Sequence, residues 1–304
     1  MAIAKVRVKI NGTWTNLSHD SSGKWTGNIT APSTTSFNQS GGYYPVVIEV
    51  TNDAGTVKTW EATDATWGNV LRLQVKETTK PVITLVSPSN GAYVTNNKQP
   101  ITFKVTDEAG GSGVKLSAVS LKIDSTTYNY NSTGMTYAEI TNGYQFVFTP
   151  STALSDGKHS LAINSADNDG NAAGAVTASI TVDTVPPTLS IITPEAGTIT
   201  NSANVTVSGT TNDAISSPVT VKVVLNGVDQ GTVTVGSDGT FSKAVSLAEG
   251  ENTIVVTATD AAGKSSSVTR TVTLDTSIPA ISSVVLTPNP VNASASVVVT
   301  VEVS

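Results

Sequence analysis

The residues best suited to chemistry in this sequence are oxygen ligands in a short polar loop. Asp167, Asp169 and Asn171 alternate along that loop, and Asp183 follows shortly before a proline pair. Hard cations such as Ca²⁺ bind several oxygen ligands, which Asp/Asn-rich turns supply. The pattern therefore predicts a Ca²⁺ site formed by Asp167, Asp169, Asn171 and Asp183. The alternative is structural, because Asp-x-x-Gly is also typical of a hairpin whose Asp caps the N–H groups of the turn.

Catalytic motifs are a weaker prospect. The chain has no cysteine and two histidines, so a thiol nucleophile and a cluster of three imidazoles are both excluded. His19 stands in a polar turn beside an Asp and a Ser, but a nucleophile–base pair is normally assembled by the fold, not by sequence neighbours. His159 is expected to be solvated at the start of a strand. No phosphate-binding loop, His-Glu-x-x-His or Gly-x-Ser-x-Gly occurs, and we expect no enzymatic activity.

The charge of the chain limits its partners. Seventeen basic and 23 acidic side chains give a net charge of −6 over 304 residues. A nucleic-acid binder needs clustered Lys and Arg to displace phosphate counterions, and no such cluster is visible. No run approaches 18 apolar residues, and the first ten residues alternate apolar and charged side chains. We therefore expect that the protein does not bind nucleic acid, does not insert into a membrane and carries no export signal.

Period-2 alternation and turn signals predict strands. Asn226-Gly227 is typical of a tight type I′ hairpin, and Asp238-Gly239 marks the next turn. About seven short strands in about 92 residues, with turns every 8–12 residues, are the pattern of an immunoglobulin-like sandwich. The strands predicted around these turns are 219–225, 228–235, 240–245, 252–259 and 265–274.

Internal repeats divide the chain into modules. Asp183 and Asp275 are separated by 92 residues, as are Pro187 and Pro279, and Pro81 marks a looser copy. In each copy a short strand ends at a proline, which fits a first edge strand because proline cannot donate to the ladder. The predicted domains are an N-terminal immunoglobulin-like module (1–79), a second (80–185), a third (186–277) and a partial β segment (278–304).

The fold class predicted is all-β, with tandem immunoglobulin-like sandwiches in a linear rod. Asp-Thr-Val-Pro-Pro and Asp-Thr-Ser-Ile-Pro lead directly from one module to the next, and proline linkers without a Gly/Ser spacer are semi-rigid. The segment 278–304 holds only two strands, and an isolated hairpin is marginal in water. Three arrangements are open: the segment packs against the third module, another subunit adds a strand at Val297, Val299 and Val301, or the segment is part of a fourth domain.

Aromatic residues are concentrated in the first module, which holds all four tryptophans. One or two of them are expected in a sandwich core. The others would suit sugar stacking or a protein interface, and the candidates are Tyr43, Tyr44 and Trp67, although packing in the core or at a hinge is an alternative for each.

The turn Thr259-Asp260-Ala-Ala-Gly263, followed by a strand and an Asp-Thr-x-x-Pro junction, resembles the bacterial immunoglobulin-like repeats of surface adhesins and phage virion proteins. The resemblance covers roughly residues 81–304. Residues 2–46 are similar to the opening module of immunoglobulin-like proteins encoded among the virion genes of Firmicutes prophages. In some related repeats, calcium at the module junctions stiffens the rod.

The resemblance implies a virion structural or decoration protein, associated with a phage tail or capsid. Such a protein is assembled in the bacterial cytoplasm and released by lysis. Its expected partners are other virion proteins, further copies of itself and a host-surface glycan. Two alternatives remain: a stalk fragment of an adhesin on the bacterial cell surface, and accessory binding modules of a secreted carbohydrate-active enzyme.

Overall fold

The computed structural model describes residues 2–304, and the chain divides into two compact units, Met1–Asp183 and Thr184–Ser304. Strands dominate both units, and residues 2–304 hold two 3₁₀ helices and no α-helix. The predicted all-β fold of tandem immunoglobulin-like sandwiches is confirmed. Within the same residues, no helix has the length and apolar character to cross a membrane.

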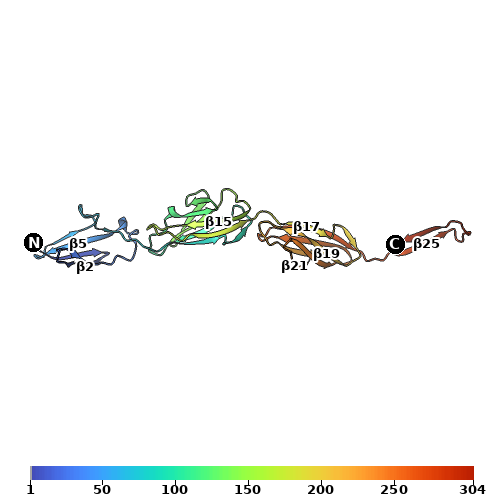
Figure 1. Cartoon of the computed structure of the whole chain (residues 1–304), viewed down its shortest axis with the longest axis horizontal. Helices are drawn as coiled ribbons and strands as arrows, with labels where there is room; N and C mark the ends of the chain where they lie inside the picture. Colours follow the sequence, from blue (N-terminus) through green and yellow to red (C-terminus); the bar gives the residue numbers. More distant parts are fainter. Residues whose placement is uncertain (1) are drawn as a thin grey trace. The chain divides into compact units, whose positions relative to one another are not determined.

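The first module is built on one main sheet (Figure 1). Its strand order is β2-β1-β5-β6, and β7 also pairs with β5. Asn11 and Gly12 have φ of 46° and 81°, which a tight turn between β1 and β2 requires. The elements are β1 (Ile3–Ile10), β2 (Thr13–Asn16), β5 (Tyr44–Asn52), β6 (Val57–Trp60), β7 (Arg72–Leu73), the hairpin β3 (Ser18–His19) and β4 (Trp25–Thr26), and the 3₁₀ helix η1 (Ser40–Gly42).

The second module is a two-sheet sandwich. One sheet has the order β13-β14-β10-β8 and the other β12-β11-β15-β16-β9, in which β9 runs parallel to β16. Strand alternation directs Phe103, Phe146 and Ile163 into the core between the sheets, where each is 0–1% exposed. The elements are β8 (Val82–Ser87), β9 (Ala92–Val94), β10 (Ile101–Thr106), η2 (Leu116–Ala118), β11 (Ser120–Ile123), β12 (Thr126–Asn129), β13 (Met135–Ile140), β14 (Gly143–Phe148), β15 (Gly157–Asn164) and β16 (Val176–Val182).

The third module repeats this plan in the second unit. Its sheets have the orders β17-β19-β22 and β18-β24-β23-β20-β21, and β18 runs parallel to β24. Phe241 packs among Val207, Ile254 and Val272 in its core. The elements are β17 (Thr188–Thr193), β18 (Thr198–Thr200), β19 (Asn204–Asn212), β20 (Thr220–Leu225), β21 (Val228–Val233), β22 (Thr240–Ser246), β23 (Gly250–Thr259) and β24 (Ser265–Leu274).

A two-stranded hairpin follows the third module. It consists of β25 (Ile281–Thr287) and β26 (Val298–Val303), which pair antiparallel. As predicted, the first strand of the second module and that of the third both lie at a sheet edge and end just before a proline, Pro88 and Pro194.

Candidate functional site

The carboxylates of three residues that are far apart in the sequence lie close together in the first unit. Glu77 follows β7, Asp107 follows β10, and Asp167 lies in the loop between β15 and β16. One carboxylate oxygen of each lies within 4.8 Å of the others. The carboxyl group of Glu108, the neighbour of Asp107, lies close enough to Glu77 to act on it electrostatically. We call these four residues the acidic cluster.

The loop after β15 holds Asp167 in place through its own backbone. Asp167 Oδ1 accepts hydrogen bonds from the N–H groups of Gly170 (2.7 Å) and Asn171 (2.8 Å). Its Oδ2 accepts from Asn171 Nδ2 at 2.7 Å. Gly170 has φ of 99°, a backbone conformation that residues other than glycine rarely adopt. Asp167 is therefore completely buried, at 0% exposure, with both oxygens already accepting one or more hydrogen bonds.

Asp107 has one satisfied oxygen and one that is not. Its Oδ2 accepts from the Gly113 N–H at 2.7 Å. Its Oδ1 is buried and receives no hydrogen bond from any residue in 2–304, although the residue is only 7% exposed. A Cβ on Gly111 would lie 2.8 Å from Asp107 Oδ2, so this backbone passes too close to the cluster for a side chain.

Glu77 lies where burial and a neighbouring acid disfavour its charged form. Its Oε1 accepts from the Ser112 N–H at 2.5 Å, whereas its Oε2 and Glu108 Oε2 are buried without a partner among the described residues. Burial, and then the neighbouring Glu108 carboxyl group, raise the pKa of Glu77 above its usual value. No ion pair found within residues 2–304 involves a carboxylate of the cluster.

The donor set of the cluster suits a hard cation. Unpaired buried carboxylate oxygens cost free energy unless a proton or a cation neutralises them. Ca²⁺ takes six to eight oxygen ligands in a flexible geometry, and Glu77, Asp107, Glu108 and Asp167 supply carboxylate oxygens from three segments. The three orphaned oxygens, on Glu77, Asp107 and Glu108, make this a fit for Ca²⁺.

The predicted metal ligands divide between the cluster and its surroundings. Asp167 belongs to the cluster. Asp169 Oδ2 instead accepts hydrogen bonds from Thr35 Oγ1 and from the Glu77 N–H. Asn171 Nδ2 donates to Asp167 and to the Glu77 carbonyl oxygen. Asp169 and Asn171 therefore connect the loop to the first module and the linker.

The grouping of Asp183 with Asp167 is wrong. Asp183 directly follows β16, and its N–H donates to the Val94 carbonyl oxygen. Asp167 precedes that strand, and seven residues of extended chain span about 23 Å. The two carboxylates therefore lie at opposite ends of β16.

Sequence reasoning did not predict that Glu77, Asp107 and Glu108 join Asp167 in one cluster. Glu77 stands four residues before Pro81, as Asp183 does before Pro187, and this repeat position was the available signal. In the third module, Asp260 takes the place of Asp167, is 6% exposed and accepts from the Lys264 N–H. Asp275 is exposed and accepts hydrogen bonds from Ser277.

The aromatic candidates differ in accessibility. Trp67 is 55% exposed and lines a small apolar pocket of about 220 Å³ with Trp60 and Val70. Tyr43 is half-buried, and the Arg72 guanidinium lies 5.0 Å from its ring centroid. Tyr44 is only 3% exposed and its hydroxyl contacts Thr34 Oγ1 at 2.6 Å, so its ring is not available for sugar stacking.

The expected tryptophan core is absent from the described residues. Trp14, Trp25 and Trp60 are half-buried, and Trp67 is exposed. The physical reason is that the first module has one main sheet, so no second large sheet covers these rings. At the other end of the chain, Val299 and Val301 lie exposed in β26, and Val297 directly precedes it at 40% exposure.

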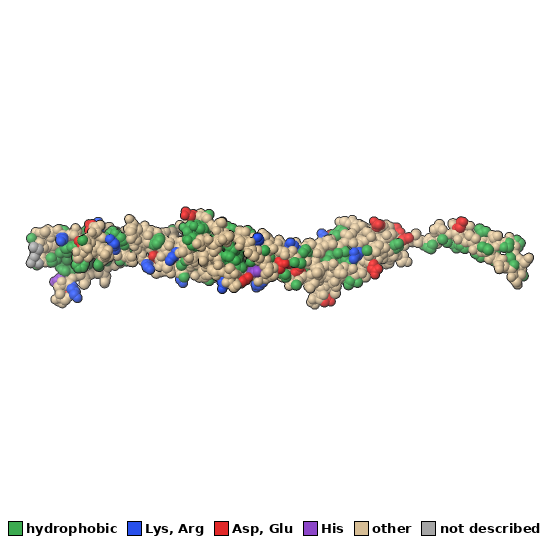
Figure 2. Space-filling view, turned by 90° about the horizontal axis from the view of Figure 1, so that it is seen from above, with side chains coloured by type: hydrophobic (Ala, Val, Ile, Leu, Met, Phe, Trp, Pro, Cys, Tyr) green, Lys and Arg blue, Asp and Glu red, His purple; other side chains and the backbone are tan. Residues whose placement is uncertain are grey.

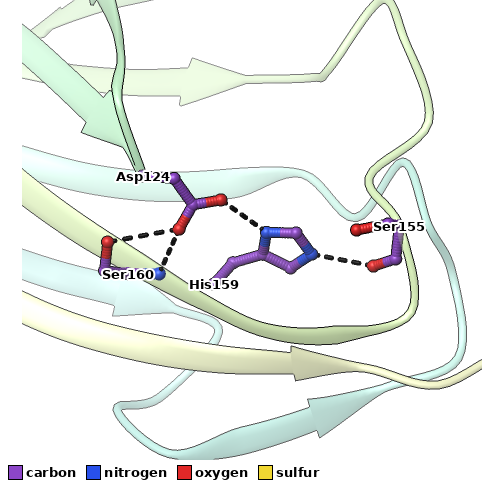
Figure 3. Close-up of polar contacts among 4 residues, drawn as sticks. All are labelled: Asp124, Ser155, His159 and Ser160. Carbon is purple, nitrogen blue, oxygen red and sulfur yellow. Dashed lines mark hydrogen bonds and ion pairs between the residues drawn. The ribbon is translucent and has the colours of Figure 1, made fainter.

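His159 is buried, so the expected solvated histidine is wrong. Its ring is held between two acceptors (Figure 3): Nδ1 lies 2.7 Å from Asp124 Oδ2, and Nε2 lies 2.8 Å from the Ser155 carbonyl oxygen. Asp124 Oδ1 also accepts from the Ser160 N–H. The group joins β15 to the end of β11 and stabilises the second module.

Comparisons with known proteins agree with the sandwich topology. Residues 77–184 match the family model of the bacterial Ig-like domain, and residues 187–276 match that of glucodextranase domain B. No curated protein matches the chain.

Three solved structures illustrate the similarity. A bacterial ice-binding adhesin is 23% identical, with 89% of this chain and 86% of that chain covered and a TM-score of 0.33. The fibronectin(III)-like modules of Clostridium thermocellum CbhA are 16% identical over 64% and 94% of the two chains (TM-score 0.39). Sidekick-1 immunoglobulin domains 1–5 are 13% identical over 92% and 55% (TM-score 0.40). By its family match, residues 77–184 form a bacterial Ig-like domain, and the sheet topology of the chain is that of tandem immunoglobulin-like sandwiches.

Proposed function

We propose that the chain is a non-catalytic structural and adhesion protein in which one Ca²⁺ ion locks the first two modules together. The observation that carries this proposal is the buried acidic cluster with its orphaned oxygens. Glu77 comes from the linker after the first module, whereas Asp107, Glu108 and Asp167 come from the second. A shared cation would therefore tie the linker to the second module and offset part of the negative charge of the four acids.

Contacts beside the cluster would transmit this effect to the first module. Thr35 donates to Asp169, and Asn38 Nδ2 donates to the Gly111 carbonyl oxygen at 2.5 Å. Asp169 and Gly111 belong to the two loops that position Asp167 and Asp107. Ordering these loops around Ca²⁺ would hold the Thr35–Asn38 segment against the second module.

A non-catalytic role is supported by how the acids are held. Asp167 is completely buried, and Asp107 is nearly so. A general acid or base must reach the proton that it transfers, and these two carboxylates are directed at one another and at backbone N–H groups.

The test is thermal unfolding of the full chain in Ca²⁺ and in EDTA. At a Ca²⁺ concentration about 1,000-fold above Kd, binding adds about 4 kcal/mol, or roughly 10 °C in Tm for a unit of this size. Asp107→Asn should abolish this shift. Asp53→Asn, which removes an equal charge at an exposed position, should retain it. An identical Tm in Ca²⁺ and EDTA would remove the proposal.

We place this protein on a phage virion, where many copies would convert weak contacts into firm attachment. The resemblance of residues 2–46 to virion-encoded modules supports this location. Trp67, with its apolar pocket, is the proposed contact for a host-surface glycan or protein. Mass spectrometry of purified particles should detect the chain, and its recovery only from the washed cell surface would favour the adhesin stalk.

Accessory modules of a secreted carbohydrate-active enzyme are the second candidate. The match of residues 187–276 to glucodextranase domain B favours it. Cosecretion with a glycoside hydrolase, together with absence from particles, would support this candidate against the virion.

A further inference from the structure

The C-terminal hairpin has two chemically different faces. Opposite residues of an antiparallel pair lie on the same face, and successive residues alternate between faces. Leu286 lies opposite Val299, Val284 opposite Val301, and Ile281 opposite Val303. The apolar face therefore consists of Ile281, Val284, Leu286, Val299, Val301 and Val303. The other face, which we call the polar face, carries Ser283, Thr287, Thr300 and Glu302, together with Val285 and Val298.

All six side chains of the apolar face are exposed. Their exposed fractions range from 43% for Leu286 to 71% for Val303. Figure 2 shows hydrophobic side chains along this terminal segment. Soluble proteins seldom leave so continuous an apolar strip in water unless it is an interaction site.

The second module shows what this strand pair does when it has a partner. In that module Leu85 lies opposite Phe103, and Ile83 lies opposite Val105, on β8 and β10. These two pairs correspond to Leu286–Val299 and Val284–Val301 in the hairpin. The positions are counted back from the proline that follows each first strand, and the count allows for the bulge between β8 and β10. Phe103 and Val105 are 0% exposed because the facing sheet covers them. The apolar face of the hairpin is therefore a core face that requires an apolar sheet opposite it.

The charge distribution permits an identical partner. Glu302 is the one charged residue in 278–304, and it lies on the polar face. Two apolar faces can thus meet without like-charge repulsion, and a contact of a surface with itself is the arrangement that a two-fold dimer requires.

The available area sets the strength of such a contact. At about 60–120 Å² for a fully exposed aliphatic side chain, the six exposed fractions leave roughly 200–400 Å² of side-chain surface per hairpin. Two facing hairpins would therefore bury about 400–800 Å² of side-chain surface in total, the size of a weak, concentration-dependent interface.

We propose that the apolar face of the β25–β26 hairpin packs against the same face of a second copy of the chain, forming a four-stranded, two-layer sandwich. Two sheets packed face to face are separated by about 10 Å. The polar face with Glu302 stays in water. This inference does not depend on Ca²⁺ or on the acidic cluster.

Sedimentation velocity of the full chain tests the proposal. Between about 10 µM and 1 mM, the range for a weak interface, the mass should rise from 31.1 kDa toward twice that value. Val301→Lys places a charge in the centre of the apolar face and should weaken the dimer at least about tenfold. Thr300→Lys adds the same charge to the neighbouring residue on the polar face and should leave the dimer intact.

Each other outcome would overturn the proposal. A chain that stays monomeric at 1 mM, about the upper limit for so small an interface, has no such contact. A dimer insensitive to Val301→Lys forms elsewhere on the chain, and one weakened equally by Thr300→Lys does not use the apolar face. Both variants lie outside the three modules, so an unchanged Tm would show that the modules remain folded, and Thr300→Lys controls for the effect of a lysine on the hairpin itself. EDTA should not alter the dimer, which separates this result from the Ca²⁺ test.

Discussion

The buried His159 forms an ion pair with the exposed Asp124 in the second module, with Nδ1 2.7 Å from Oδ2. The second ring nitrogen faces the carbonyl oxygen of Ser155, which can only accept. Since Asp124 as a carboxylate also only accepts, both ring nitrogens must carry protons to satisfy the two contacts. The structure therefore favours the imidazolium form of a histidine that is 7% exposed.

The stability of the second module should fall as pH rises past neutrality. Burial alone would lower the pKa of His159, but hydrogen bonds to Ser155 and Asp124 outweigh it and raise this pKa. The stabilisation is fully present below the unfolded pKa of about 6.5 and is lost as pH rises through the folded pKa. We expect the difference in unfolding free energy between the wild type and His159→Gln to shrink from pH 6 to pH 9. A difference that is constant over this range in urea titrations would contradict the imidazolium assignment.

Calcium binding should weaken in acid. Because burial and Glu108 raise the pKa of Glu77, protons compete with the cation for this carboxylate, and metal ligands must be deprotonated. In the metal-free protein the same shift makes the neutral acid the stabilising form, and that stability is lost as pH rises through the folded pKa. The Tm gain from Ca²⁺ is therefore expected to be larger at pH 7.5 than at pH 5. Glu77→Gln should reduce this pH dependence, whereas Glu61→Gln in the first module should not.

Gly143 should tolerate no side chain. A Cβ at this position in β14 would collide with the carbonyl oxygen of Val105 and lie 2.8 Å from the Thr106 Cα. Both are backbone atoms of β10, so the strands would have to separate, and we expect Gly143→Ala to cost about 1–3 kcal/mol. Gly174→Ala is the matched control in the same module, since a Cβ there has nothing within 4 Å. Chemical denaturation of both variants measures the difference, and equal stabilities would be the contrary result.

Asn252 should be among the costliest polar residues to replace in the third module. It is 0% exposed, its Nδ2 donates to the carbonyl oxygens of Ala248 and Gly250, and its Oδ1 accepts from the Ala248 N–H and Asn226 Nδ2. Asn252→Ala leaves buried backbone groups unpaired, at about 1–3 kcal/mol each. We expect a loss of about 3 kcal/mol in urea unfolding, against less than about 1 kcal/mol for Ala substitution of the half-buried Gln230. Similar losses for the two variants would show that the network contributes little.

Local signals predicted the sandwiches well. The strands expected at 240–245 and 265–274 are Thr240–Ser246 and Ser265–Leu274 in the structure. Asn226 and Gly227 take the positive φ values, 49° and 82°, that the type I′ turn needs. Alternation and turn chemistry are encoded within a few neighbouring residues, so a single sequence contains them. The domain boundaries and the rod remain predictions.

The acidic cluster was only partly predictable, because it depends on contacts distant in sequence. Asp167 was identified from its loop, but Glu77 lies 90 residues before it and Asp107 lies 60 before it. Neither belongs to the same local pattern. Asp183 was misplaced for a related reason: the run after Asp167 had to be recognised as a full-length strand that carries the chain away from the loop.

The parallel pairing of β9 with β16, and of β18 with β24, affects how each module would resist tension. The three residue pairs Ala92–Ile180, Tyr93–Thr181 and Val94–Val182 join a strand near the start of the second module to its last strand. A force applied to the two ends of the module would shear the hydrogen bonds of this strand pair. All of these hydrogen bonds would then have to break together, instead of one after another. Modules built in this way should extend only at high force.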